Sequence, residues 1–134
     1  MFLARTGVSK EKIKEYVVKE FGYDLSKSVD EMRPLHKHEE SCMDALPKAL
    51  ASFFEGESYE DVVRNAVSLG GDTDTIAAIA GAMADAMYGV PVGILAKGVQ
   101  YLEDDMSKVC SAFQNFVKGE IEPNELKAEA GKKN

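Results

Sequence analysis

The chain has 134 residues, the length of one ordinary domain and enough to bury a hydrophobic core. Hydrophobic residues make up 45% of it and charged residues 29%, with a formal net charge of −7; this composition is typical of soluble globular proteins. The negative charge argues against a nucleic-acid partner, because phosphate contacts need clustered lysine and arginine. No segment approaches about 18 consecutive apolar residues, so the composition also argues against a membrane span.

The two cysteines, Cys42 and Cys110, are too few for a disulfide framework. We predict that both are buried thiols in a reducing compartment. The first residues contain an apolar stretch that is too short for a signal peptide. These features together predict a cytoplasmic location.

The N-terminal third of the chain shows helical spacing of apolar residues. Ser9 is predicted to cap a helix that closes at Gly22. Ser28 and Glu31 have the spacing of a capping box, which predicts the start of a short turn before Pro34. The polar stretch at residues 35–41 lacks periodicity and is predicted to be a loop.

Three further helices are predicted up to residue 88. Leu46, Leu50 and Phe53 mark the first, in which Pro47 is tolerable only near the first turn.

The second follows Ser58 and is predicted to bury a face formed by Val62, Ala66 and Val67. The third, Ile76–Tyr88, is apolar nearly all round, which predicts burial of most of its surface.

Two more helices are expected, at residues 92–104 and 105–118. The second has an apolar stripe that is predicted to face inward: Met106, Val109, Cys110, Phe113, Phe116 and Val117. From Gly119 onward the chain is polar and charged, so residues 119–134 are predicted to be a flexible tail. No segment has the pattern of a strand, and the predicted fold class is all-α.

The most informative segment is the aspartate turn, defined here as Gly70-Gly71-Asp72-Thr73-Asp74-Thr75. Its two acids lie between a glycine pair and the start of the apolar helix, where residues two apart can aim their carboxylates into one space. Oxygen ligands alone suit hard cations such as Mg²⁺, Mn²⁺ or Ca²⁺. The glycines permit unusual dihedrals and a close approach of the backbone to a ligand.

Taken alone, this pattern fits a helix cap as well as it fits a metal site. Asp74 or Thr73 capping the helix, with Asp72 in its own Asx-turn, accounts for the acids without any metal. Two other motifs are excluded by spacing and context. An EF-hand loop needs glycine and glutamate where Ala77 and Met83 stand. The Asp-x-Asp-Thr element of haloacid-dehalogenase-like phosphatases follows a hydrophobic strand, whereas a helix-forming segment precedes the aspartate turn.

A longer pattern makes the interpretation specific. The run from Ser68 to Gly81 resembles the C-terminal signature of the ADP-ribosylglycohydrolase family. The similarity extends over most of residues 1–118 through further matching segments: Ser41-Cys42, Pro47-Lys48-Ala49, Tyr59-Glu60-Asp61 and Tyr88-Gly89-Val90-Pro91.

The resemblance implies an all-α fold with two Mg²⁺ or Mn²⁺ ions in a cleft that binds ADP-ribose. Such enzymes hydrolyse the bond between ADP-ribose and a protein side chain. Asp72 and Asp74 match metal-binding carboxylates and Thr75 matches a hydroxyl ligand, while Gly70 and Gly71 would line the cleft with their backbone. The implied mechanism is metal-assisted attack of water on the anomeric carbon.

The family's other half-site, which includes a Thr-Asp-Asp triplet, has no match in this chain. Residues 1–118 are therefore predicted to be a partial domain, the C-terminal half of the family fold, and no catalytic base can be assigned. Two carboxylates and a hydroxyl leave most of a Mg²⁺ shell to water. We expect weak metal binding and little or no activity by this chain alone, whether its gene is split, truncated or degenerate.

The sequence leaves three further possibilities open, concerning association, non-catalytic binding and a second metal site. The chain is expected to form a homo-oligomer or to bind a missing N-terminal half through its unpartnered apolar surface. A non-catalytic module that binds ADP-ribose or a metal, or that only oligomerises, fits the same sequence. His36 and His38 with Cys42 form a weaker transition-metal candidate, because a fourth ligand is missing.

Overall fold

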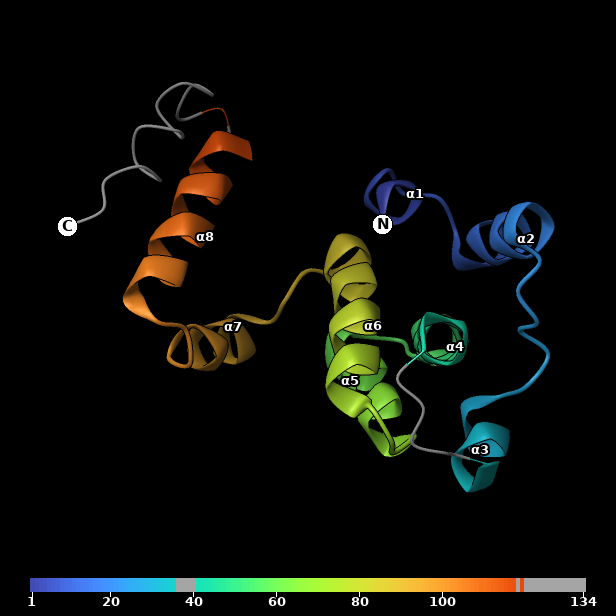
Figure 1. Ribbon diagram of the computed structural model, residues 1–134. Helices are drawn as coiled ribbons and strands as arrows, with labels where there is room; N and C mark the ends of the chain where they lie inside the picture. Colours follow the sequence, from blue (N-terminus) through green and yellow to red (C-terminus); the bar gives the residue numbers. More distant parts are fainter. Residues whose placement is uncertain (36–40, 118, 120–134) are drawn as a thin grey trace. The chain divides into compact units, whose positions relative to one another are not determined.

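The described part of the chain, residues 1–35, 41–117 and 119 of a computed structural model, folds into helices without any strand (Figure 1). The predicted all-α class is thus confirmed. In chain order the elements are α1 (Phe2–Arg5), α2 (Lys10–Phe21), α3 (Val29–Met32), the 3₁₀ helix η1 (Arg33–Leu35), α4 (Cys42–Glu55), α5 (Tyr59–Ser68), α6 (Thr73–Tyr88), α7 (Val92–Val99) and α8 (Asp104–Val117).

The helices belong to two compact units, Met1–Pro91 and Val92–Asn134. The first unit contains α1 to α6 and the second contains α7 and α8. The predicted tail at residues 119–134 lies almost wholly outside the described residues, so the domain boundary at residue 118 stays a prediction. In the ranges that the structure describes, we find no helix whose length and hydropathy would let it span a membrane.

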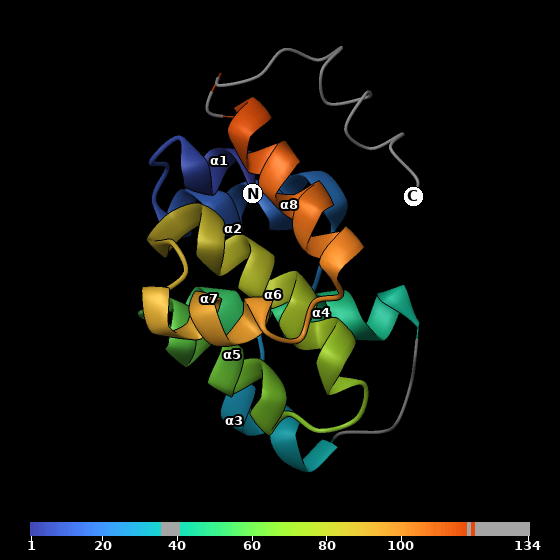
Figure 2. The ribbon, with the colours of Figure 1, turned by 90° about the vertical axis from the view of Figure 1, so that its left-hand side faces the viewer.

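Helices α4, α5 and α6 form the core of the first unit, and Figures 1 and 2 show α5 and α6 running side by side. The contact faces carry many small residues, which let the helix axes approach closely. Burial of one larger side chain stabilises the fold by about 1.5–3 kcal/mol. The core side chains that are at most 1% exposed are Ala49, Phe53, Val62, Ala66, Leu69, Ile76, Ala80 and Ala84, with Val29 from α3.

The predicted helix starts at Ser9 and Ser58 are confirmed, although the Ser9 side chain makes no capping hydrogen bond, and the short turn predicted after Ser28 is a helix. Ser9 precedes α2, which ends at Gly22 with φ 69°. The Ser28 hydroxyl accepts a hydrogen bond from the Glu31 N–H, and the Glu31 carboxylate accepts one from the Ser28 N–H, completing the capping box of α3. Ser58 likewise accepts from the N–H of Asp61 at the start of α5.

Two predictions about buried faces are wrong in α5 and α6. Val67 is 53% exposed, because it lies about 100° around the helix from buried Ala66. Helix α6 buries only Ile76, Ala80, Gly81 and Ala84 rather than most of its surface. Its packing partners α1, α4 and α5 leave other apolar side chains of α6 open, among them the exposed Ala78.

Within the second unit, the predicted inner stripe of α8 is not buried. Met106, Val109, Phe113 and Val117 are each more than half exposed, and Cys110 is exposed too. The second unit has only two described helices, so it offers too little surface to cover this stripe, and Ala112 is the one buried residue of α8.

Cys42 is exposed at the first position of α4, so the prediction of two buried thiols is wrong for both cysteines.

Pro47 lies deeper in α4 than expected. Ser41 caps the helix, which begins at Cys42 and places Pro47 in the second turn rather than the first. The proline lacks the N–H that would bond the Met43 carbonyl. Met43 is 76% exposed, so this carbonyl lies in a part of the helix that water reaches.

The turn between α4 and α5 depends on Gly56. A Cβ atom at this position would lie 2.7 Å from the Val62 backbone nitrogen and 2.8 Å from its Cα. We predict that Gly56→Ala destabilises the first unit by about 1–3 kcal/mol, since backbone atoms must move to relieve the clash. Urea unfolding measures this change.

Gly81→Ala is the matched control for that substitution. Its Cβ would meet Tyr59 Oη at 3.5 Å, an ordinary contact, and alanine favours the interior of a helix. We expect a neutral or slightly stabilising effect. Equal losses in the two variants would contradict the proposed close approach at Gly56.

The capping box predicts a pH dependence of stability. Hydrogen bonds from the Ser28 backbone N–H and from its hydroxyl hold the pKa of Glu31 below its ordinary value of 4.5. A lowered folded pKa stabilises the protein above the unfolded pKa, and this contribution disappears as the pH falls through the folded value. Glu31→Gln should therefore be less stable than wild type at neutral pH, with the difference shrinking in acid. A difference that grows in acid would contradict the capping role.

Candidate metal site

The chain reverses direction between α5 and α6 through the glycine pair. Helix α5 ends at Ser68, and Leu69 follows as its C-cap with only 1% exposure. Gly70 and Gly71 then adopt φ values of 71° and 73°. Side chains with a Cβ rarely adopt this left-handed region, so the turn requires glycine at both positions.

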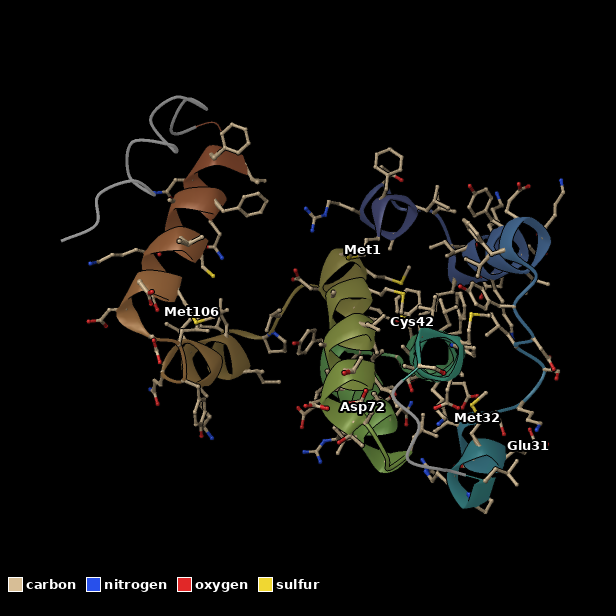
Figure 3. The ribbon with its side chains drawn as sticks, in the orientation of Figure 1. Met1, Glu31, Met32, Cys42, Asp72 and Met106 are labelled. Carbon is tan, nitrogen blue, oxygen red and sulfur yellow. The ribbon has the colours of Figure 1, made fainter. Side chains whose placement is uncertain are left out.

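The two aspartates of the aspartate turn lie at the N-terminal end of α6, where Figure 3 labels Asp72. Asp72 is the N-cap residue and is half-buried, but its side chain makes no capping hydrogen bond. Asp74 and Thr75 lie exposed in the first helical turn, and the Thr75 N–H donates to Asp74 Oδ1 at 3.0 Å. The N-cap residue is thus Asp72, whereas the alternative interpretation placed Thr73 or Asp74 at that position.

The donor atoms of this turn suit a hard cation. They are two carboxylates and a hydroxyl, all oxygen, which is the ligand type that Mg²⁺ and Mn²⁺ prefer. The positive end of the α6 dipole opposes a cation, and the two carboxylates reverse that local charge. In the described ranges no three acidic, histidine or cysteine side chains gather in a metal-binding cluster. By itself the turn supplies three oxygen ligands, about half of the six that Mg²⁺ takes.

The residues of the transition-metal candidate cannot be placed, and a nearby arginine is paired elsewhere. His36 and His38 lie outside the described residues, so the transition-metal candidate stays untested. Arg64 forms an exposed ion pair of 2.6 Å with Glu60 on the surface of α5.

Sequence reasoning missed a polar contact next to the turn. Arg33 Nε donates to Ser68 Oγ at 2.9 Å, which joins η1 to the last turn of α5. The residues are 35 positions apart, and Arg33 lies outside the signature run that begins at Ser68. No spacing in the sequence could have indicated this pair, because it arises only when α3 and α5 are folded together.

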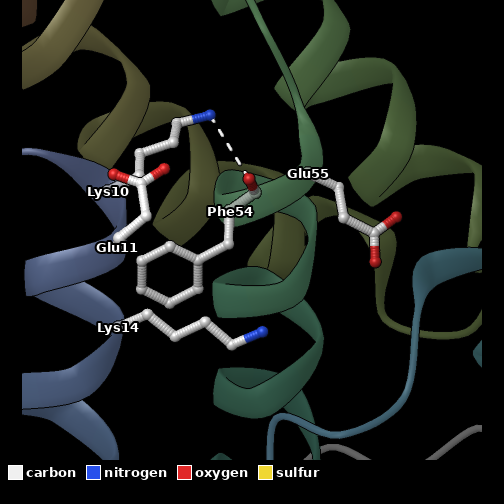
Figure 4. A pocket seen from close by; sticks show the side chains of 5 residues that line it. All are labelled: Lys10, Glu11, Lys14, Phe54 and Glu55. Carbon is white, nitrogen blue, oxygen red and sulfur yellow. Dashed lines mark hydrogen bonds between the residues drawn. The ribbon is translucent and has the colours of Figure 1, made fainter.

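A second missed contact involves Lys10, at the far end of α6. Its ammonium group donates to the carbonyls of Phe54 and Gly56, at the C-terminus of α4. Figure 4 shows the Phe54 bond beside a small cavity. The Tyr88 hydroxyl donates to the same Gly56 carbonyl at 3.1 Å. The Lys10 ammonium also lies 5.2 Å from the centre of the Tyr88 ring, within the range of a cation–π interaction.

Comparison with known proteins identifies the class. Residues 4–124 match the ADP-ribosylglycohydrolase family, so the chain belongs to that family of hydrolases. It is 36% identical over 81 residues to an uncharacterized protein of Archaeoglobus fulgidus, a match that covers 58% of this chain and 27% of the relative. The chain thus spans about a quarter of that relative's length. No solved structure matches it.

The positive φ of Gly71 leads to a further prediction. Gly71→Ala should lower the free energy of unfolding by about 1–2 kcal/mol, because a Cβ is disfavoured in the left-handed region. Gly71→Asn should cost less, since asparagine tolerates this conformation. Thermal unfolding measures both. Equal losses for alanine and asparagine would show that space, rather than backbone conformation, dictates glycine here.

Proposed function

We propose that this chain is part of a Mg²⁺- or Mn²⁺-dependent hydrolase that releases ADP-ribose from modified protein side chains, and that it contributes half of the metal site. The observation that carries the proposal is the aspartate turn. It brings Asp72, Asp74 and Thr75 to the start of α6 in a chain that belongs to the ADP-ribosylglycohydrolase family.

In this function Asp72, Asp74 and Thr75 would hold the cation through oxygen atoms. A bound cation supplies electrostatic polarisation of the ribose hydroxyls and of the attacking water. The backbone of Gly70 and Gly71, which has no side chain, would let the ligand approach the turn closely. The half-buried carboxylate of Asp72, with no capping bond to α6, is available for this task.

The chain alone is expected to bind metal weakly and to have little or no activity. Three oxygen ligands fill about half of the six positions that Mg²⁺ requires. The ligands that are missing would come from the N-terminal half of the family fold, which lies outside this sequence, or from a second copy of this chain.

An apolar groove beside α6 supports such a partner. It is lined by Met1 and Leu46 with four residues of α6: Ala78, Ile79, Ala82 and Met83. An open apolar surface of this kind favours association. The groove lies on the helix that carries the aspartate turn, so a partner seated there would lie close to the metal ligands.

A second function has one observation in its favour. Because no cluster of three metal-binding side chains exists in the described ranges, the chain could act without catalysis, as a module that binds ADP-ribose or a metal or that only oligomerises. Release of ADP-ribose from a modified protein, assayed in Mg²⁺ with this chain mixed with a polypeptide that carries the Thr-Asp-Asp half-site, separates the two functions, because only the first expects turnover by the mixture. The cytoplasmic location and the lack of a nucleic-acid partner stay predictions from composition.

The metal proposal predicts the effect of removing single carboxylates. Asp72→Asn and Asp74→Asn should each weaken Mn²⁺ binding at least about tenfold, because each loses an anionic ligand. Isothermal titration calorimetry with MnCl₂, and separately with ADP-ribose in the presence of MnCl₂, measures the change.

Asp85→Asn is the matched control. It removes the same charge from an exposed position on α6, about 20 Å along the helix from Asp72. We expect wild-type affinity in this variant. An equal loss in all three variants would indicate general electrostatic attraction rather than a site, and no heat with wild type would contradict metal binding by this chain.

A further inference from the structure

The segment of α3 and η1 makes a side-chain connection to the end of α5. Arg33 Nε donates to Ser68 Oγ at 2.9 Å, and the Ser68 hydroxyl donates in turn to the Asn65 carbonyl at 2.7 Å. Ser68 is the last residue of α5 and lies two positions before Gly70. This connection, here called the Arg33–Ser68 strut, thus ends at the beginning of the aspartate turn.

Arg33 is held in place by the helix that precedes it. Its Nη1 pairs with the Asp30 carboxylate, one turn back. Val29, at the start of α3, is 1% exposed, and its N–H donates to Glu55 Oε1 of α4 at 2.9 Å. Together with the capping box, these contacts fix α3 to the core. The backbone that carries the Arg33 guanidinium group is therefore held in place relative to Ser68.

The aspartate turn is joined to α5 by weak backbone contacts. The two backbone bonds that close α5, from Leu69 N to Ala66 O and from Gly70 N to Val67 O, are both long at 3.3 Å. The glycines are conformationally permissive, and the Asp72 side chain makes no capping bond. While the packing of α6 places the far side of the turn, the position of its α5 side therefore depends on how firmly the last turn of α5 is held.

We propose that Arg33 is a positioning residue for the aspartate turn, acting through Ser68, and that its loss weakens cation binding without unfolding the protein. The proposal rests on the proposed function for the identity of the bound cation. The contacts of Arg33 are with Ser68 and Asp30, so its effect on the turn passes through Ser68. Its side chain is 41% exposed, and exposed polar contacts contribute little to global stability. Removing the Arg33 side chain should therefore reduce local order at the turn while leaving the overall stability nearly unchanged.

The test compares Arg33→Gln, Ser68→Ala and the double variant with wild type. We expect the Mn²⁺ dissociation constant to rise about three- to tenfold in each, the range that corresponds to the loss of one net hydrogen bond. Amide hydrogen exchange at residues 70–75 should accelerate by a similar factor. The double variant should lose no more than either single one, because all three remove the same strut. The unfolding midpoint in urea should change little.

Two controls isolate the strut from general effects. Ser68→Thr keeps the hydroxyl and should retain wild-type exchange and affinity. Arg64→Gln removes an arginine of α5 that pairs with Glu60 instead, so it makes the same chemical change without touching the strut.

Unchanged exchange at the turn in Arg33→Gln and Ser68→Ala would overturn the proposal, as would additive losses in the double variant or an equal effect of Arg64→Gln. If wild type itself binds no Mn²⁺, the proposed metal site is wrong, and the exchange measurements still decide whether Arg33 positions the turn.

Discussion

Helix α6 packs on its neighbours through residues no larger than alanine at the middle of its length. Ala80 and Ala84 are completely buried, and Gly81 is buried beside Tyr59 and Val63 of α5. Small side chains let helices pack at short interaxial distance, which fixes the position of one against another more closely than long, flexible side chains would. Since only four residues join α5 to α6, this packing determines where the aspartate turn lies.

The same arrangement explains how carboxylates can face a cation at the end of a helix that itself attracts anions. The unbonded N–H groups at a helix N-terminus usually stabilise acidic side chains by capping. Here Asp74 accepts the Thr75 N–H, whereas Asp72 occupies the cap position without a capping bond. One aspartate therefore interacts with the helix end, and the other retains its acceptor capacity for a ligand. Helix cap and metal ligand are compatible roles within a single turn.

Local chemistry explains why much of this could be predicted from the sequence. Ser28 with Glu31, Ser58 with Asp61, and the glycine pair before Asp72 each act over a few residues, so their spacing alone indicates the structure. The outcome for Val67 and for the α8 stripe differed, because burial depends on which element comes to lie against a face. The Arg33–Ser68 contact joins residues 35 positions apart and leaves no periodic signal. For the metal role itself, the turn's shape is consistent with the sequence interpretation, but ligation stays a prediction.

The position of the apolar groove on α6 has a thermodynamic consequence. Ala78 and Ala82 line the groove, while Thr75 stands one turn before Ala78 on the same helix. A partner in the groove and a cation at the turn would thus both bind to one rigid element. Suppose that the partner and the cation both prefer the same placement of α6. The factor by which the bound partner raises the affinity for the cation then equals the factor by which the bound cation raises the affinity for the partner. A single coupling free energy would then govern both assembly and metal binding.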